Sequence, residues 1–519
     1  MGVVEMDAEL VSQLRHSRSQ SAFIRALGPT VARVARCAPI GLLLPAIADA
    51  HVALLTPYIL PIPLPVYIFA CVATLIITFA SVGYMVRASA PAVLVSGTHS
   101  VAGSPLGQLI VRWVVQAVRA AAVFLLALTV IAGYVGIKHP LGNISMLLFW
   151  TIFMIGLAYL TVLIGNVFEI INPWRTIVRV AEACGLSFSK ARISYPSGLA
   201  YYPALLFYIA IVWIELLVLP LPSTLSTALI VYTLVTLAGS WLFGTQAWFE
   251  HAEFFNVFFR LIGLLAPVEY VRAENARSWQ IHLRRPILGL VECRATHISL
   301  VVFVLFMLSA TTYDAIHQTQ LWQNLYWVSA LSLTKPLWGT DLAKAQSMLM
   351  GGYLIYLRAS LVLSPMLYLG IYSLAIWVMK AVTRTKIPLS TLMQEFAFSI
   401  IPIAVVYNIT HNLTEILDRW RAFPALLTDP FGFGWNIFGV STMPVVQQSI
   451  EMGPIWHTQV ALMLVGHMIS VYVAHLTALR VFRSRHESVI SQIPLLTLMV
   501  VYTVVGLWIL TLPIKAFAD

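Results

Sequence analysis

The chain has 519 residues, of which 60% are hydrophobic and 10% are charged, and its formal net charge is +10. A soluble protein of this length could not bury so many apolar side chains, because its surface must be largely polar. The composition therefore excludes an ordinary soluble protein and predicts a membrane protein, in which apolar side chains face lipid.

The first predicted element is a signal-like segment at residues 1–50. A basic leader precedes the short apolar run 38–47, and residues 48–50, Ala-Asp-Ala, match the small-residue pattern of a cleavage site. The run is too short and too rich in proline for a membrane span. We predict cleavage that leaves His51 as the mature N-terminus, outside the cytoplasm. The alternative is an uncleaved amphipathic anchor.

After this segment, apolar stretches predict about ten transmembrane helices, and hence an all-α, polytopic helical membrane protein. No internal repeat or linker divides the sequence, so residues 51–519 are predicted to form a single integral membrane domain. The predicted spans are residues 65–86, 118–136, 146–168, 200–219, 225–245, 297–315, 352–379, 390–411, 455–479 and 491–512.

Basic residues indicate how the chain crosses the bilayer. The connectors on one side of the predicted spans contain eighteen Lys and Arg residues, and those on the other side contain six. Because Lys and Arg are retained in the cytoplasm during insertion, the basic side is predicted to be inside. We therefore expect a protein of the bacterial cell inner membrane, with the mature N-terminus and the C-terminus outside. The positive charge is then a topology signal, and no nucleic-acid partner is predicted.

Other features predict structure rather than chemistry. The four cysteines have no short-spaced pair, so neither a disulfide framework nor a Cys-based zinc site is expected. The aromatic run 250–260 looks amphipathic and is predicted to lie in the membrane interface. Glu215 and Arg358 fall in predicted spans and are expected to be paired structurally. Tryptophans in the outer connectors 316–351 and 412–454 are compatible with an aromatic belt or with a vestibule for an apolar ligand.

Histidines and carboxylates on the predicted outer face are the candidates for chemistry. Neutral imidazoles and carboxylates are ligands of zinc, copper and manganese. His411 and Glu415 are four residues apart at the end of the eighth span, so they share one helical face. They could be two metal ligands, a ligand with its orienting carboxylate, or simply a polar helix end. Asp314, at the outer end of the sixth span, is a candidate ligand or general base.

Further histidines lie in or before the predicted spans. His475 is about 12 Å deeper in the ninth span than His467 at 1.5 Å per residue, so one metal ion cannot readily bind both. Either His467 belongs to an outer site and His475 to an inner polar network, or both line a proton path. His51, if freed by cleavage, could chelate copper through its α-amine and imidazole; otherwise it is a mobile terminus. The sequence contains no P-loop, serine-nucleophile elbow or H-E-x-x-H pair, so ATP-driven transport and a serine-hydrolase mechanism lack support.

Short motifs along nearly the whole mature chain occur in the order found in one known family. They are Ala50-His51, Leu60-Pro61-Ile62-Pro63, Asn172-Pro173-Trp174-Arg175, Phe254 to Pro267, Leu283-Arg284-Arg285-Pro286, Ser309 to Asp314, the His411 segment, Thr428-Asp429-Pro430, Gly434-Trp435 and Gln459 through Arg480. In these motifs the chain resembles the bacterial polytopic membrane proteins called fenitrothion hydrolases. The resemblance implies hydrolysis of an organophosphorus triester with release of a nitrophenol. It carries no assignment of catalytic residues.

A metal-activated water could perform this reaction, because a bound metal lowers the pKa of water and stabilises developing charge. We therefore predict a divalent metal (zinc, copper or manganese) and an apolar small-molecule substrate that arrives through the lipid bilayer. The rival functions are a secondary transporter and a copper- or haem-binding redox protein, and the need for a partner protein stays open. The predicted site consists of His51, His411, His457 and His467 as metal ligands, with Asp314 or Glu415 as the base or a bridging ligand.

Overall fold

The structure is a computed structural model, and it describes residues 62–86, 98–100, 105–218, 220–272, 279–339, 341–439 and 452–512. The predicted signal-like segment, its cleavage site and His51 lie outside the described residues, as do residues 513–519.

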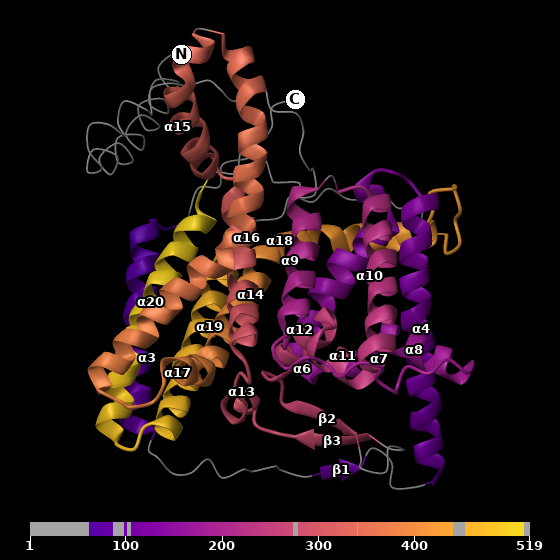
Figure 1. Cartoon of the computed structure of the whole chain (residues 1–519), viewed down its shortest axis with the longest axis horizontal. Coiled ribbons are helices and arrows are strands. Elements are labelled where there is room, and N and C mark those ends of the chain that lie inside the picture. Colours follow the sequence, from indigo (N-terminus) through magenta and orange to yellow (C-terminus); the bar gives the residue numbers. More distant parts are fainter. Residues whose placement is uncertain are drawn as a thin grey trace, which may run out of the picture.

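The described chain is almost entirely helical, which confirms the predicted all-α polytopic fold (Figure 1). Within it, nine helical segments are long and apolar enough to cross a membrane. A shorter apolar helix, α9 (Tyr202–Leu217), falls at the fourth predicted span, so every predicted span overlaps an apolar helix. The nine segments are Leu64–Met85, Gly107–Val135, Ile144–Ile164, Pro222–Phe243, Ile298–His317, Leu342–Thr383, Leu389–Thr428, Gly453–Val481 and Arg485–Leu510.

The first half of the described chain contains long helices and several short connecting ones. The middle of the third apolar segment, η2, is a π-helix rather than an α-helix. The elements are α3 (Leu64–Met85), β1 (Thr98–Ser100), α4 (Pro105–Val135), η1 (Pro140–Gly142), α5 (Ile144–Met146), η2 (Leu147–Gly156), α6 (Leu157–Ile164), α7 (Phe168–Ile171), α8 (Pro173–Ala183), α9, α10 (Pro222–Phe243), α11 (Thr245–His251) and α12 (Phe254–Gly263).

The second half contains the longest helix, α16. Its elements are β2 (Val268–Arg272), β3 (Trp279–Leu283), α13 (Leu288–Glu292), α14 (Ile298–His317), α15 (Gln320–Trp338), α16 (Leu342–Thr383), α17 (Leu389–Phe396), η3 (Ala397–Ile400), α18 (Ile401–Thr428), α19 (Met452–Val481) and α20 (Arg485–Leu510).

Local sequence explains where several of these helices begin. Asn172 caps α8, with its side chain accepting a hydrogen bond from the Arg175 amide at 3.0 Å, and Pro173 occupies the first helical position. Asp341 caps α16 in the same way, accepting from the Lys344 amide at 3.0 Å. These caps satisfy backbone donors that would otherwise lack partners at the start of a helix.

The helices pack as two groups joined by a central core (Figure 1). Helix α3, although first in the chain, packs against α19 and α20, and these contact α16 and α18. Helix α4 packs against α10 and α8 in the other group. Helix α14 joins the two groups, because it contacts α9 on one side and α16 and α18 on the other.

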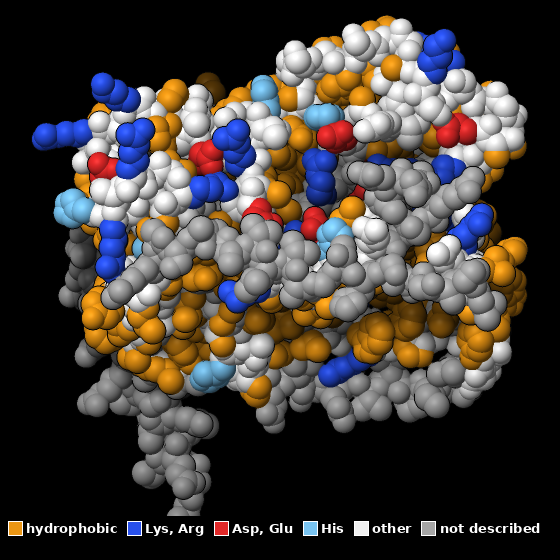
Figure 2. Space-filling view, turned by 90° about the horizontal axis from the view of Figure 1, so that it is seen from below, with side chains coloured by type: hydrophobic (Ala, Val, Ile, Leu, Met, Phe, Trp, Pro, Cys, Tyr) orange, Lys and Arg blue, Asp and Glu red, His pale blue; other side chains and the backbone are white. Residues whose placement is uncertain are grey.

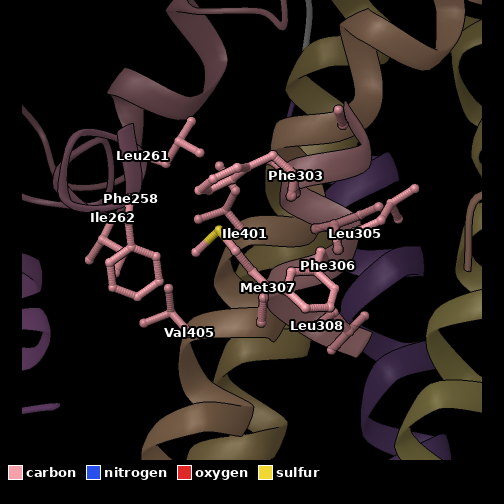
Figure 3. Packing of buried hydrophobic residues seen from close by; sticks show 14 of the residues in the cluster. Phe258, Leu261, Ile262, Phe303, Leu305, Phe306, Met307, Leu308, Ile401 and Val405 are labelled. Carbon is pink, nitrogen blue, oxygen red and sulfur yellow. The ribbon is translucent and has the colours of Figure 1, made fainter. Parts of the chain in front are cut away.

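The aromatic run 250–260 forms part of this core, so its predicted place in the membrane interface is wrong. Phe254, Phe255 and Phe259 are completely buried, and α12 packs against α6, α9 and α18. A helix that is apolar on nearly all sides is stable inside a protein rather than at its surface. Figure 3 shows side chains of α12 beside those of α14 and α18, and the labelled residues are Phe258, Leu261, Ile262, Phe303, Leu305, Phe306, Met307, Leu308, Ile401 and Val405.

The bundle has two different ends. At the end that we call the sheet end, β1, β3 and β2 form an antiparallel sheet in that order, with Thr98 opposite His282 and Val268 opposite Leu283. Lys and Arg side chains are spread over this face (Figure 2). Here Glu395 accepts hydrogen bonds from Arg294 at 2.8 Å and from Arg480 at 2.6 Å, which ties α17 to α19.

At the opposite end, which we call the hairpin end, α15 and the first turns of α16 project beyond the other helices (Figure 1). Trp327 is buried in this hairpin, with its ring 5.4 Å from that of Tyr353. Trp322 packs against Tyr356 with ring centroids 5.3 Å apart. These two tryptophans therefore hold α15 against α16. The sequence predicted an aromatic belt or a ligand vestibule for the tryptophans, and it did not predict this packing role.

Candidate functional site

The structure brings Asp314 and His411 together from two helices. Asp314 lies in the last turn of α14, His411 lies in α18, and His411 Nε2 is 2.8 Å from Asp314 Oδ2. Their side chains are 13% and 19% exposed, respectively, so the pair is half-buried and still reached by solvent. Two residues that the sequence singled out separately thus form one hydrogen-bonded pair, which we call the dyad.

Helix α18 extends the dyad into a line of polar side chains. Tyr407, His411, Glu415 and Arg419 follow one another at intervals of four residues, so each lies about one turn from the next on neighbouring positions of one helix face. Arg419 Nε lies 3.5 Å from Glu415 Oε1. The sequence predicted the i, i+4 pair of His411 and Glu415, but not the continuation to Tyr407 and Arg419.

Glu415 and Arg419 form the polar wall of a cleft between α18 and the first group of helices. Glu215 of α9 is partly buried and lines the same cleft. The remaining walls are apolar. The cleft is lined by Met146, Trp150, Thr151, Ile214, Glu215, Pro220, Leu221, Thr224, Leu225, Glu415 and Arg419.

The dyad has the geometry of an orienting carboxylate and a proton acceptor. A carboxylate bonded to one ring nitrogen of histidine fixes the tautomer and stabilises the imidazolium that forms when the other nitrogen takes a proton. The hydrogen bond from Nε2 to Asp314 holds the imidazole ring of His411 in place. Asp314 therefore acts through His411, and Glu415 is engaged with Arg419 one turn away.

The other predicted metal ligands lie elsewhere. His457 Nε2 is 3.1 Å from Tyr67 Oη, and its Nδ1 is 2.8 Å from the Gly453 carbonyl oxygen. His467 is buried in α19, with Nδ1 2.8 Å from the Met463 carbonyl oxygen.

The described residues contain no group of three or more His, Cys, Asp or Glu side chains that could hold a metal ion. The dyad supplies two such side chains, Asp314 and His411, which is fewer than a stable zinc site requires. The third predicted partner, His51, lies outside the described residues. The metal therefore stays a prediction, and no catalytic step is derived through it here.

Sequence reasoning missed a buried carboxylate, Glu253, at the start of α12. Its Oε1 accepts hydrogen bonds from the Tyr232 hydroxyl and the Phe255 amide, and its Oε2 accepts from Asn172 Nδ2 at 3.1 Å and the Asn256 amide at 2.9 Å. Burial raises the pKa of Glu253, and these four donors oppose that shift. The network joins α8, α10 and α12 and has a structural role. A glutamate just before a mostly apolar helix was the available signal.

No protein-family model, curated protein or solved structure matches the chain. The resemblance to fenitrothion hydrolases accordingly stays a prediction from the sequence motifs.

Proposed function

We propose that this multi-pass membrane protein hydrolyses uncharged, apolar organophosphorus triesters of the fenitrothion type. The observation that carries the proposal is the 2.8 Å hydrogen bond between His411 and Asp314 at a half-buried position of the bundle. The sequence motifs shared with fenitrothion hydrolases suggest the substrate class, and the dyad supplies a chemical group suited to the reaction.

In the proposed reaction, His411 is the general base. Its imidazole takes a proton from water while the water oxygen forms a bond to phosphorus. The bond between phosphorus and the aryl oxygen then breaks, and the nitrophenol leaves as its anion. Asp314 stabilises the imidazolium during this step, since a carboxylate beside a charged histidine favours the charged form. The proton on His411 afterwards returns to solvent.

The membrane supplies the substrate. Triesters of this class carry no charge and dissolve in lipid, so an enzyme whose site opens within the bilayer meets them at high local concentration. The apolar walls of the cleft beside Glu415 suit such a molecule, because ligand sites combine apolar linings with a few polar groups. We place the protein in the bacterial inner membrane with the hairpin end outside, on the evidence of the basic connectors.

The proposal is tested by measuring nitrophenol release from fenitrothion by the purified protein. The His411→Ala variant should lose activity by about 100-fold or more, the usual contribution of a general base. His139→Ala is the matched control, because His139 is exposed in the loop after α4. Full activity of a folded His411→Ala variant would rule the proposal out.

The predicted metal is tested on the same samples. Elemental analysis should find zinc, copper or manganese bound to the active protein, and chelation should abolish nitrophenol release. Undiminished hydrolysis by protein shown to be free of these metals would refute the metal prediction and leave the dyad as the base on its own.

A further inference from the structure

A second polar site lies deeper in the bundle, in a small cavity where five helices meet. Leu308 and Thr312 of α14, Tyr368 of α16, Tyr407 of α18, His467 of α19 and Tyr502 of α20 all line it. The cavity is about 20 Å³, which is space for at least one water molecule.

Three buried polar atoms at this cavity have no hydrogen-bond partner among the described residues. They are His467 Nε2, the Tyr407 hydroxyl and the Tyr502 hydroxyl. His467 is only 2% exposed. Because buried polar groups are nearly always hydrogen-bonded, these atoms indicate a small polar molecule in the cavity that bonds to all of them.

The backbone determines what His467 offers to that molecule. His467 Nδ1 is 2.8 Å from the Met463 carbonyl oxygen, so in the neutral ring Nδ1 carries the hydrogen and Nε2 is an acceptor. The two tyrosine hydroxyls can donate or accept. Water fits this set, since it donates to Nε2 and accepts from a hydroxyl. The titratable groups that face His467 across the cavity are Tyr368, Tyr407 and Tyr502.

The cavity connects to the dyad on one side. Tyr407, which lines the cavity, precedes His411 of the dyad by one turn of α18. The distance along the helix from Tyr407 to His411 is therefore about 6 Å.

Toward the sheet end, α19 carries further proton-transfer groups. The Ser470 hydroxyl is also buried without a hydrogen-bond partner among the described residues, and His475 is buried five residues further along α19. Ser470 lies one turn below His467 on the same face of α19. His475 Nδ1 bonds to the Gln492 side chain at 3.0 Å.

We infer that water in this cavity links His467 to the dyad and that these groups form a proton path through the bundle. The path runs from Asp314 and His411 through Tyr407 and His467 to Ser470 and His475. Ionisable groups inside a membrane bundle are costly, and proton relays are one of their recognised uses. This inference concerns proton movement and does not depend on the proposed hydrolysis.

The test uses purified protein in sealed lipid vesicles that contain a pH-sensitive dye, with proton entry driven by a potassium diffusion potential. Vesicles with the wild-type protein should acidify faster than protein-free vesicles. His467→Gln should lose the protein-dependent flux, because glutamine keeps an acceptor in the cavity but cannot take up and release a proton. Tyr407→Phe should reduce the flux as well, and His139→Gln should conduct like the wild type.

The inference is overturned if wild-type vesicles acidify no faster than protein-free vesicles, or if His467→Gln conducts like the wild type. Nitrophenol release measured in detergent on a His475→Gln protein, which should also lose the flux, separates the two proposals. The release should be retained, because His475 belongs neither to the dyad nor to the predicted metal ligands.

Discussion

At the scale of single residues, the most constrained polar group in the described chain is Glu253. It is completely buried, and each carboxylate oxygen accepts two hydrogen bonds. A glutamine at this position has one acceptor oxygen and one amide nitrogen, and the nitrogen would face donors. At least one donor, a backbone amide, would then lose its acceptor, because the Tyr232 hydroxyl can accept as well as donate but an amide N–H cannot.

We expect Glu253→Gln to lower the free energy of unfolding by about 1–3 kcal/mol, the cost of one unsatisfied buried donor. The midpoint of thermal unfolding in detergent measures the change. Glu250→Gln is the matched control and should leave it unaltered, since Glu250 lies exposed three residues earlier. Equal midpoints for both variants would contradict the structural role of Glu253.

The sequence identified Asp314, His411 and Glu415 as candidates, because polar side chains at the ends of apolar helices are rare and stand out. It could not show that Asp314 meets His411, since 97 residues separate them and their contact depends on how α14 packs on α18. Glu253 was missed for a related reason. Its four partners come from three different helices, and no local pattern in the sequence reports such a network.

At the scale of helices, the dyad depends on close packing of α18 and α19. Gly466 lies in α19, where an added methyl group would be 2.8 Å from the Val406 side chain and 3.1 Å from the Pro402 carbonyl oxygen. Small residues allow such close approach between membrane helices. Gly466 is next to His467, and Val406 is next to Tyr407, so a shift here would reach both proposed sites.

Gly466→Ala should destabilise the protein by about 1–3 kcal/mol, the usual cost of inserting a methyl group into a filled core. Gly370→Ala in α16 provides the comparison, because nothing lies within 4 Å of the position of its added methyl group. That substitution should be neutral or slightly stabilising, since alanine favours helix. Thermal unfolding of both variants measures these stability changes. A Gly466→Ala protein as stable as the wild type would show that α18 and α19 can move apart without cost.

Most helices could be predicted from apolar length alone, but their ends and burial could not. Helix α16 is 42 residues long, well beyond the predicted span 352–379, because the helix already begins in the hairpin, before the predicted span starts. Helix α18 likewise continues past residue 411, and its Leu426 packs near α4 and α5. The burial of α12 depends on tertiary packing. An aromatic-rich helix is compatible both with the interior of a protein and with the membrane interface, so its sequence alone does not distinguish the two locations.

At the scale of the whole molecule, the described parts of the basic connectors lie at the sheet end and the hairpin lies at the other (Figure 1). The predicted topology therefore has a direct test. With Cys37, Cys71, Cys184 and Cys293 replaced by serine, a membrane-impermeant maleimide should label Lys335→Cys in intact bacterial cells. It should not label Lys386→Cys until the cells are opened. The reverse pattern would invert the proposed orientation.

The central claim is that Asp314 and His411 act as one unit to activate water. The most direct measurement compares nitrophenol release by the wild type, Asp314→Asn, His411→Ala and the double variant. Each single substitution should lower the rate by about 100-fold or more, and the double variant should be no slower than the slower single variant, because residues that act as a unit are not additive. The claim would be contradicted if either folded single variant kept the wild-type rate. It would also be contradicted if the rate loss of the double variant equalled the product of the two single losses.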